Sequence, residues 1–236
     1  MRIGRRQAVP SRVEGVENVA VDVRDADAVA RAAEGASVVY HCVNPLYQEW
    51  PEMLLPMTRG IVDGAARARA RLVVLDNLYM YGDTSHMTEE SPMAPVSKKG
   101  ALRVQAAELL LDADARGRVP VVALGREAAR GVWMMPVQPA ETSRAVLDRF
   151  GRAMGTEVRI SQVPLWVLRA AGIFWRTGAE IAEMTYQWRQ PYFLDDSKFR
   201  ARFGVVPTPW DVAVRATVAW GRAELGDKVS PVHSAA

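Results

Sequence analysis

The spacing of apolar residues in the first half of the chain predicts alternating strands and helices. Segment 16–25, VENVAVDVRD, alternates apolar and polar positions and ends in aspartates, which predicts a strand followed by a turn. The short apolar runs at 37–43 and 71–77 are typical of strands buried in a parallel sheet. A further run of this kind spans 119–125. Four parallel strands are therefore expected in this half.

Helical patterns fill the intervals between these strands, at 25–35, 51–70 and 99–117. Asp25 is a suitable N-terminal cap for the first helix. Pro56 predicts a late start or a kink in the second. The order β-α-β-α-β-α-β predicts an α/β fold with a shortened Rossmann-like, doubly wound parallel sheet and right-handed crossovers. In such sheets ligands bind beyond the carboxyl ends of the strands.

The second half has a different pattern and predicts a small C-terminal α/β lobe. Strands are expected at 132–137 and 156–164, and helices at 141–155, 165–188, 195–204 and 208–225. The aromatic residues of this half are expected to form the core of the lobe: Trp166, Trp175, Tyr186 and Trp188. We therefore predict a Rossmann-like domain over 1–128 and a substrate-type lobe over 129–236.

Composition narrows the class of protein. The chain has 236 residues, 49% of them apolar, which is ample for a core. A single cysteine, Cys42, excludes a disulfide framework, and the three histidines have no metal-site spacing, so no metal is expected. The net charge of +3 comes from dispersed arginines without a basic stripe, so nucleic acid is not an expected partner.

Targeting and membrane signals are also missing from the sequence. The N-terminal segment 1–15 is basic but lacks the apolar core of a secretory signal. No apolar run reaches the roughly 18 residues that a membrane span needs. We therefore expect a cytoplasmic protein without a membrane partner, acting on a small-molecule substrate.

Four segments together resemble the NAD-dependent epimerase/dehydratase family, the extended short-chain dehydrogenases. Segment 19–42 is similar to the family's D-x-x-D strand, turn and helix, and 73–83 to its strand that ends in serines before V-Y-G. Segment 89–103, EESPMAPVSKKGALR, is similar to the stretch that carries the family's tyrosine and lysine. Segment 195–220 is similar to its C-terminal D-x-S-K element and closing helix.

The resemblance implies an altered catalytic set. The family's serine, tyrosine and lysine positions match Asn77, Lys99 and Arg103, and Tyr79 is a further polar candidate nearby. The usual tyrosine acts as a general acid and base because a neighbouring lysine lowers its pKa. Arg103 cannot act as a base. The alternative for Lys99 is a solvated lysine at a helix start, beside Lys98, so whether the protein is an enzyme stays open.

The resemblance also implies NAD or NADP as cofactor, with Asp22, Val23 and Asn44 at the cofactor site. However, the family opens with a strand, a G-x-x-G-x-x-G turn and a helix that seats the pyrophosphate. Segment 1–15 contains no such motif and resembles only the tail of that unit. A protein without a cofactor is therefore the alternative.

Candidate substrate-binding residues are Tyr47, Tyr81 and His86, which lie in loops near the strand ends. A packed core tyrosine is the alternative for Tyr81. His41 is expected to be a core histidine. After the strand at 119–125, the long substrate-binding insertion of the family has no counterpart.

Three functions stay open. The first is an NAD-dependent epimerase/dehydratase-like protein acting on a small hydroxy/carbonyl or sugar-nucleotide-type substrate with altered chemistry. The second is a cofactor-independent isomerase, cyclase or lyase that uses the same crevice. The third is a non-catalytic relic or binding protein. A homo-oligomer is also expected, because loss of the first strand leaves a sheet edge that must be covered.

Overall fold

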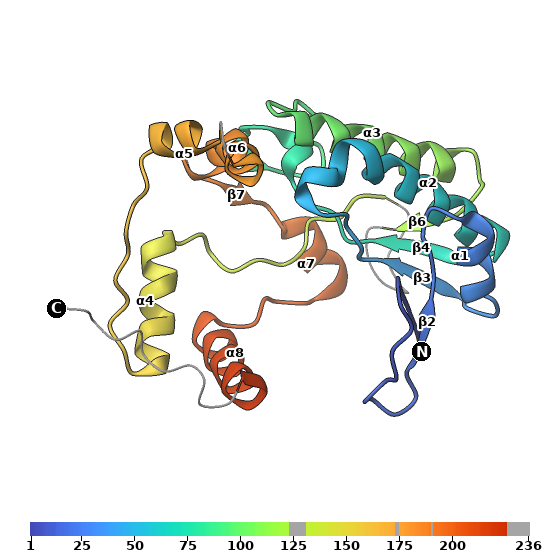
Figure 1. The fold of residues 1–236 in the computed structure, drawn as a ribbon, viewed down its shortest axis with the longest axis horizontal. Coiled ribbons are helices and arrows are strands. Elements are labelled where there is room, and N and C mark those ends of the chain that lie inside the picture. The colour runs from blue at the N-terminus through green and yellow to red at the C-terminus, as the bar shows by residue number, and fades with distance from the viewer. Residues whose placement is uncertain (123–130, 173–174, 190, 226–236) are drawn as a thin grey trace.

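The computed structural model describes residues 1–122, 131–172, 175–189 and 191–225 (Figure 1). The strands are β1 Arg2–Arg5, β2 Glu17–Ala20, β3 Val38–His41, β4 Arg71–Val74, β5 His86–Met87, β6 Val121–Val122 and β7 Phe193–Leu194. The α-helices are α1 Ala26–Ala32, α2 Trp50–Arg67, α3 Lys98–Ala115, α4 Ser143–Met154, α5 Leu165–Ala171, α6 Arg176–Glu183, α7 Ser197–Phe203 and α8 Trp210–Leu225. Three 3-10 helices are η1 Tyr47–Glu49, η2 Tyr79–Tyr81 and η3 Met184–Trp188.

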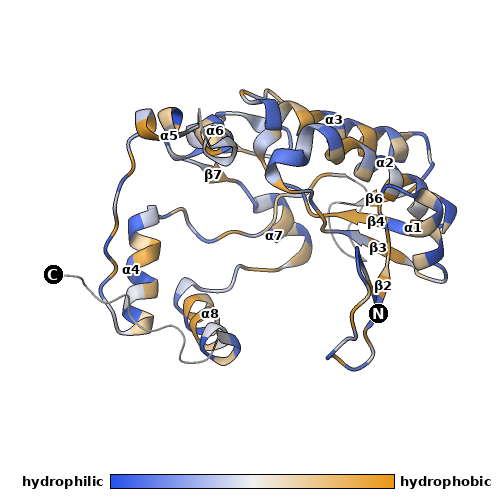
Figure 2. Cartoon of the chain, in the orientation of Figure 1, coloured by the Kyte–Doolittle hydropathy of each residue, from blue (hydrophilic) through white to orange (hydrophobic). Residues whose placement is uncertain are grey.

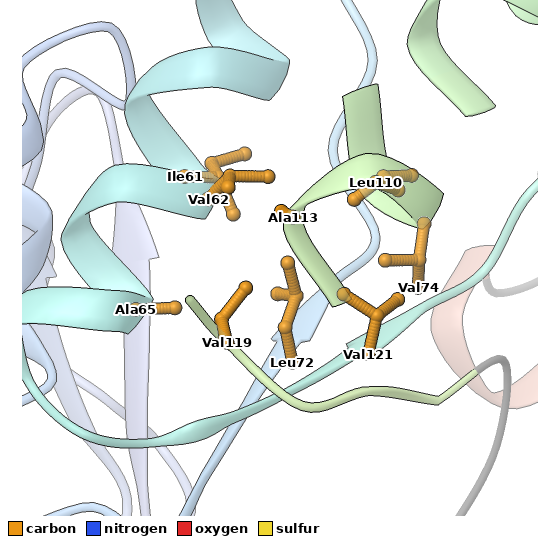
Figure 3. Close-up of a cluster of buried hydrophobic side chains, with 9 residues drawn as sticks. All are labelled: Ile61, Val62, Ala65, Leu72, Val74, Leu110, Ala113, Val119 and Val121. Carbon is orange, nitrogen blue, oxygen red and sulfur yellow. The ribbon is translucent and has the colours of Figure 1, made fainter. Parts of the chain in front are cut away.

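The predicted α/β fold is confirmed. Strands β3, β4 and β6 form a parallel sheet in that order, and α2 and α3 pack against one face of it (Figure 1). Hydrophobic residues occur along these strands and in α2 and α3, and also in α4 and α8 (Figure 2). The main core cluster lies between them (Figure 3): Ile61, Val62, Ala65, Leu72, Val74, Leu110, Ala113, Val119 and Val121.

Local signals place the first helices where the sequence predicts them. The Asp25 carboxylate accepts hydrogen bonds from the backbone N–H groups of Asp27 and Ala28, as an N-terminal cap does. The predicted late start of the second helix is wrong. Helix α2 begins at Trp50, and Pro56 lies inside it.

The N-terminal segment contains a strand that the sequence did not predict. Strand β1 pairs in parallel with β2, from Arg2 opposite Glu17 to Arg5 opposite Ala20. No ladder within the described residues joins this pair to the sheet β3-β4-β6. Among the described residues the doubly wound sheet is therefore divided into separate parallel pieces, and the edge of β3 away from β4 has no strand partner there.

The C-terminal half contains fewer strands than expected within the described residues. The strands predicted at 132–137 and 156–164 are wrong, because within the described residues these extended runs find no ladder partner. Strand β7 pairs instead with β5 of the first half. The segment 123–128 and the predicted boundary at 128/129 lie outside the described residues.

The predicted aromatic core of this half is also wrong. Trp166 is 72% exposed, Trp175 51% and Trp188 68%. The helices α5 and α6 are short and pack on each other, and α6 also packs on η1 and η3. Tyr186 is half-buried, and Met184 is the buried residue of η3.

Candidate functional site

The candidate site lies where β3 and β4 end and α3 begins. Asn44 follows β3, and Asp76 and Asn77 follow β4. Lys99 and Arg103 come from the first turns of α3, one helical turn apart. Parallel strands and the helix that follows bring these residues to one edge of the sheet, as the sequence predicts.

Arg103 is the centre of a buried polar cluster. Its side chain is 5% exposed, and its Nη1 donates to Asp76 Oδ1 at 2.8 Å. Its Nη2 donates to Asn44 Oδ1. The guanidinium carbon lies 4.2 Å from the centroid of the Trp50 ring, a cation–π contact. Arg103 therefore joins the ends of both strands to α2.

Lys99 is also buried, so the interpretation of a solvated lysine is wrong. It is 2% exposed, and its Nζ donates to the Glu180 carboxylate of α6. The ammonium group lies 4.3 Å from the Tyr47 ring centroid and 5.8 Å from that of Trp50. A carboxylate and two aromatic faces therefore offset the loss of hydration of this charge.

Asn77 and Tyr79 shape the turn after β4. Asp76 Oδ1 accepts from the backbone N–H of Asn77, and Asn77 Oδ1 accepts from that of Tyr79. Both contacts are side-chain capping of a turn. The Tyr79 ring lies 6.0 Å from Trp50, between centroids, so Tyr79 is packed beside the cluster.

Burial shifts the proton affinities of several groups here. It raises the pKa of the Asp76 carboxyl, although Arg103 opposes the shift. Burial, with the nearby Arg103 charge, lowers the pKa of His41 to about 4. Burial and a hydrogen bond with Tyr79 raise the pKa of the Tyr47 hydroxyl. Asp76 is thus a site carboxyl whose pKa moves toward the neutral range.

A cavity of about 120 Å³ adjoins Asp76 and Asn77. Its wall is mostly apolar and comes from the end of β4, from α3 and from segment 131–135: Val74, Leu78, Met80, Tyr81, Leu110, Trp133 and Met134 are among the lining residues. Tyr81 is 3% exposed and belongs to a core cluster, so it packs in the core and lines the cavity as well. Lys99 and Arg103 do not line it.

Other candidates lie apart from this cluster. His86 is exposed, with its Nε2 3.8 Å from Asp195 Oδ2. The Asp22 carboxylate is engaged by Arg24, whose Nη2 lies 2.6 Å from Asp22 Oδ2, and Val23 packs against the main core. Of the predicted cofactor residues, Asn44 is the one that the structure brings to the cluster.

These contacts do not fit a dinucleotide. The Asp22 carboxylate and the Asn44 amide oxygen are each occupied by an arginine of the same chain. Segment 6–16, between β1 and β2, forms neither a helix nor a glycine-rich turn that could present N–H groups to a pyrophosphate.

Sequence reasoning missed two acidic residues of α6. Glu180 pairs with Lys99, and Glu183 Oε1 accepts from the backbone N–H of Lys98. Both lie in a helical segment that we expected to be structural. No local pattern links residues more than 80 positions apart, so the sequence carries no signal for this pairing.

Within the described ranges, no helix is both long and apolar enough to cross a membrane. Nor do three or more His, Cys, Asp or Glu residues gather there as a metal site would require.

Comparison with known proteins supports the fold. No protein-family model matches the chain, and no curated protein matches it. Among solved structures, UDP-N-acetylglucosamine 4-epimerase from Bacillus cereus is 12% identical with a TM-score of 0.58, covering 94% of this chain and 89% of that one. A mutant dTDP-glucose 4,6-dehydratase from Streptomyces venezuelae, solved with NAD bound, is 16% identical with a TM-score of 0.57, covering 91% and 82%.

Uronate dehydrogenase from Agrobacterium tumefaciens is similar in the same way, at 14% identity and a TM-score of 0.51, with 93% and 79% covered. The chain therefore has the Rossmann-like fold of the extended short-chain dehydrogenases. The resemblance inferred from its motifs is confirmed as one of fold.

Proposed function

We propose that this protein binds a small hydroxyl- or carbonyl-bearing molecule of the sugar-nucleotide or sugar-acid type, and that it acts on it without hydride transfer. The observation that carries the proposal is the convergence of Asn44, Asp76 and Arg103 at the carboxyl ends of β3 and β4. This is where proteins of this architecture bind ligands. The epimerases, dehydratases and dehydrogenases of the same fold suggest the substrate class.

The proposed chemistry is a redox-neutral proton transfer. Asp76 lines the cavity, and burial raises its pKa, which suits a carboxyl that accepts and returns a proton. Asn77 also lines the cavity, and its side-chain amide would orient a substrate hydroxyl or carbonyl. Lys99 and Arg103, which are held by carboxylates, would keep the site in shape and supply positive potential.

The proposed reaction does not use a dinucleotide. Two observations support leaving it out: arginines of the same chain engage Asp22 and Asn44, and segment 6–16 lacks a glycine-rich turn. The retained fold would then serve a cofactor-independent isomerase or lyase rather than an oxidoreductase.

A non-catalytic binding protein is the second candidate. The observation that favours it is the internal pairing of both buried cations, Lys99 with Glu180 and Arg103 with Asp76. Paired charges are less available to a substrate. Turnover of a bound compound would separate an enzyme from this alternative.

The test is a calorimetric titration with UDP-N-acetylglucosamine, dTDP-glucose and glucuronate, and a thermal-shift series with NAD, NADH, NADP and NADPH. A ligand at 100 times its Kd stabilises the fold by about 2.7 kcal/mol, which a thermal shift detects. We expect at least one sugar compound to bind and the four dinucleotides to give no shift.

Asn77→Ala should weaken sugar binding at least about tenfold, the effect of one lost hydrogen bond of about 1.4 kcal/mol. Asn18→Ala in β2, a residue that does not line the cavity, is the matched control and should bind normally. A clear shift with any dinucleotide would overturn the cofactor-free proposal. Failure of all three sugar compounds, with folded protein, would overturn the substrate class.

A further inference from the structure

The cavity beside Asp76 has a largely apolar interior. On the helix side it is lined by Ala107, Leu110 and Leu111, which have the spacing of one face of α3. Four of the ten methionines of the chain also line it: Met80, Met93, Met134 and Met135. Because methionine side chains are unbranched, they adjust to the shape of a bound group. The wall is therefore both apolar and adaptable.

The carboxylates of this wall already have partners within the chain. Asp114 Oδ1 accepts from the backbone N–H of Val121. Asp76 Oδ1 accepts from Arg103, and Asn77 Oδ1 accepts from a backbone N–H of the turn after β4. A ligand oxygen at this end of the cavity would therefore meet the amide NH2 group of Asn77.

Neither water nor an unsubstituted sugar ring suits the rest of the interior. An ordered water in a cavity needs about two to four polar partners, which an apolar wall does not provide. Each sugar hydroxyl that left water without a new hydrogen-bond partner would cost binding free energy. The transfer of a hydrocarbon group from water to such a wall is favourable instead. The wall therefore selects the apolar part of a ligand.

The size of the cavity and its mouth suit a single ring. Its volume is about 120 Å³, and an apolar protein cavity of about 150 Å³ holds a benzene molecule. Leu75, Leu111 and Met135 line the cavity and yet are 57%, 39% and 39% exposed, so they lie at its mouth. An apolar group that enters would also cover these exposed side chains, which adds to its binding.

We propose that this cavity is a subsite for an aromatic ring or a branched alkyl group of the ligand, whose hydroxyl or carbonyl group lies against Asn77. The polar end of this arrangement rests on the function proposed above. The apolar subsite deepens that function, because it adds a second feature to the substrate class. A sugar compound with an aryl or alkyl substituent has both features, whereas an unsubstituted sugar has only the polar one.

The test is a titration with toluene and with benzyl alcohol, followed by NMR of the methionine methyl groups. Both probes contain the ring, and only benzyl alcohol has a hydroxyl group. The signals of the four cavity methionines should shift on addition of either probe. Met57 in α2 and Met154 in α4 do not line the cavity, so their signals are internal references and should stay unchanged.

A variant that fills the cavity tests the same point. Ala107→Leu should weaken the binding of both probes at least about tenfold, because the leucine side chain takes the space of the ring. Ala115→Leu makes the same change at an exposed position of the same helix, and it should bind both probes as the unaltered chain does. Equal binding by the two variants would overturn the subsite.

If Ala107→Leu does not fold, the NMR titration of the unaltered chain decides. Cavity methionines that do not shift, or that shift no more than Met57 and Met154, would overturn the subsite.

Asn77→Ala tests the polar end separately. The loss of one hydrogen bond should weaken benzyl alcohol about fivefold and leave toluene unchanged. An equal effect on both probes would overturn the orientation proposed for the ligand.

The apolar subsite and the proposed function fail separately. If the sugar compounds do not bind while toluene shifts the cavity methionines, the substrate class proposed above is overturned and the subsite stands. If a sugar compound binds while neither probe shifts these methionines, the subsite is overturned and the proposed function stands.

Discussion

Arg103 donates to Asp76 Oδ1 at 2.8 Å, in a site where the Arg103 side chain is only 5% exposed. The pair connects α3 to the end of β4, across 27 positions of sequence. Removing one member of such a pair leaves an uncompensated buried charge, which costs about 3–5 kcal/mol. We expect Asp76→Asn and Arg103→Met each to lower the free energy of unfolding by about that amount, measured by urea denaturation.

The double variant Asp76→Asn/Arg103→Met distinguishes this cause from lost packing. With both charges gone, no unpaired charge remains, so its destabilisation should be smaller than the sum of the two single effects by about 2 kcal/mol or more. The exposed pair of Arg116 and Asp112 is the control, and Asp112→Asn should cost less than about 1 kcal/mol. Strict additivity would contradict the proposed coupling.

His41 should make the protein sensitive to mild acid. Its side chain is buried, its Nδ1 has no hydrogen-bond partner among the described residues, and burial lowers its pKa from 6.5 to about 4. Because the unfolded chain takes up the proton first, stability is present above pH 6.5 and is lost as the pH falls toward about 4. The loss attributable to His41 is about 3 kcal/mol over that interval.

The measurement is urea denaturation at a series of pH values, for the unaltered chain and for His41→Gln. The raised pKa of Asp76 has the opposite effect over the acid range, so the difference between the two chains isolates His41. A profile for His41→Gln that runs parallel to that of the unaltered chain would show that His41 does not titrate in this way.

Local patterns predicted the helices well because their signals lie within a few residues of each other. The Asp25 cap is three residues or fewer from the N–H groups that it binds, and Gly155 ends α4 at a φ of 75° that favours glycine. The predicted strands at 132–137 and 156–164 failed for the opposite reason. A strand needs a partner, and an apolar run does not say whether one is available.

The sequence predicted where the candidate site lies, but not whether its side chains are buried or solvated. Topology alone places Asn44, Asp76 and Arg103 at one sheet edge. Whether Lys99 is solvated depends on Glu180, which comes from a distant helix. The burial of Lys99 therefore follows from tertiary packing that no motif encodes.

Gly60 is required by the close approach of α2 to the chain after β2. A Cβ at this position would collide with the Val23 carbonyl oxygen and lie 2.7 Å from the Arg24 carbonyl carbon. We expect Gly60→Ala to destabilise the protein by about 1–3 kcal/mol, the cost of overpacking against backbone. Gly221→Ala in α8 is the control, since no atom of another described part of the chain lies within 4 Å of its Cβ position. Alanine has the better helix propensity, so Gly221→Ala should stabilise the protein by about 0.5–1 kcal/mol. Equal effects of Gly60→Ala and Gly221→Ala in thermal unfolding would contradict the packing argument.

The free edge of β3 leads to the last prediction, self-association of the chain. The Ser37 and His41 carbonyls accept from β4, so the alternate residues Val38 and Tyr40 direct their backbone groups to the other edge, and Tyr40 is 61% exposed. Such an edge invites pairing with a second copy.

We expect a concentration-dependent dimer by analytical ultracentrifugation. Tyr40→Pro removes the N–H group of that edge and should weaken the dimer at least about tenfold, the effect of about 1.4 kcal/mol. Tyr40→Ala keeps the N–H group and is the matched control, which should retain most of the association. If the chain stays monomeric at high concentration, self-association is excluded. If Tyr40→Pro leaves the dimer intact, the association lies at another surface, because pairing at this edge requires that backbone group.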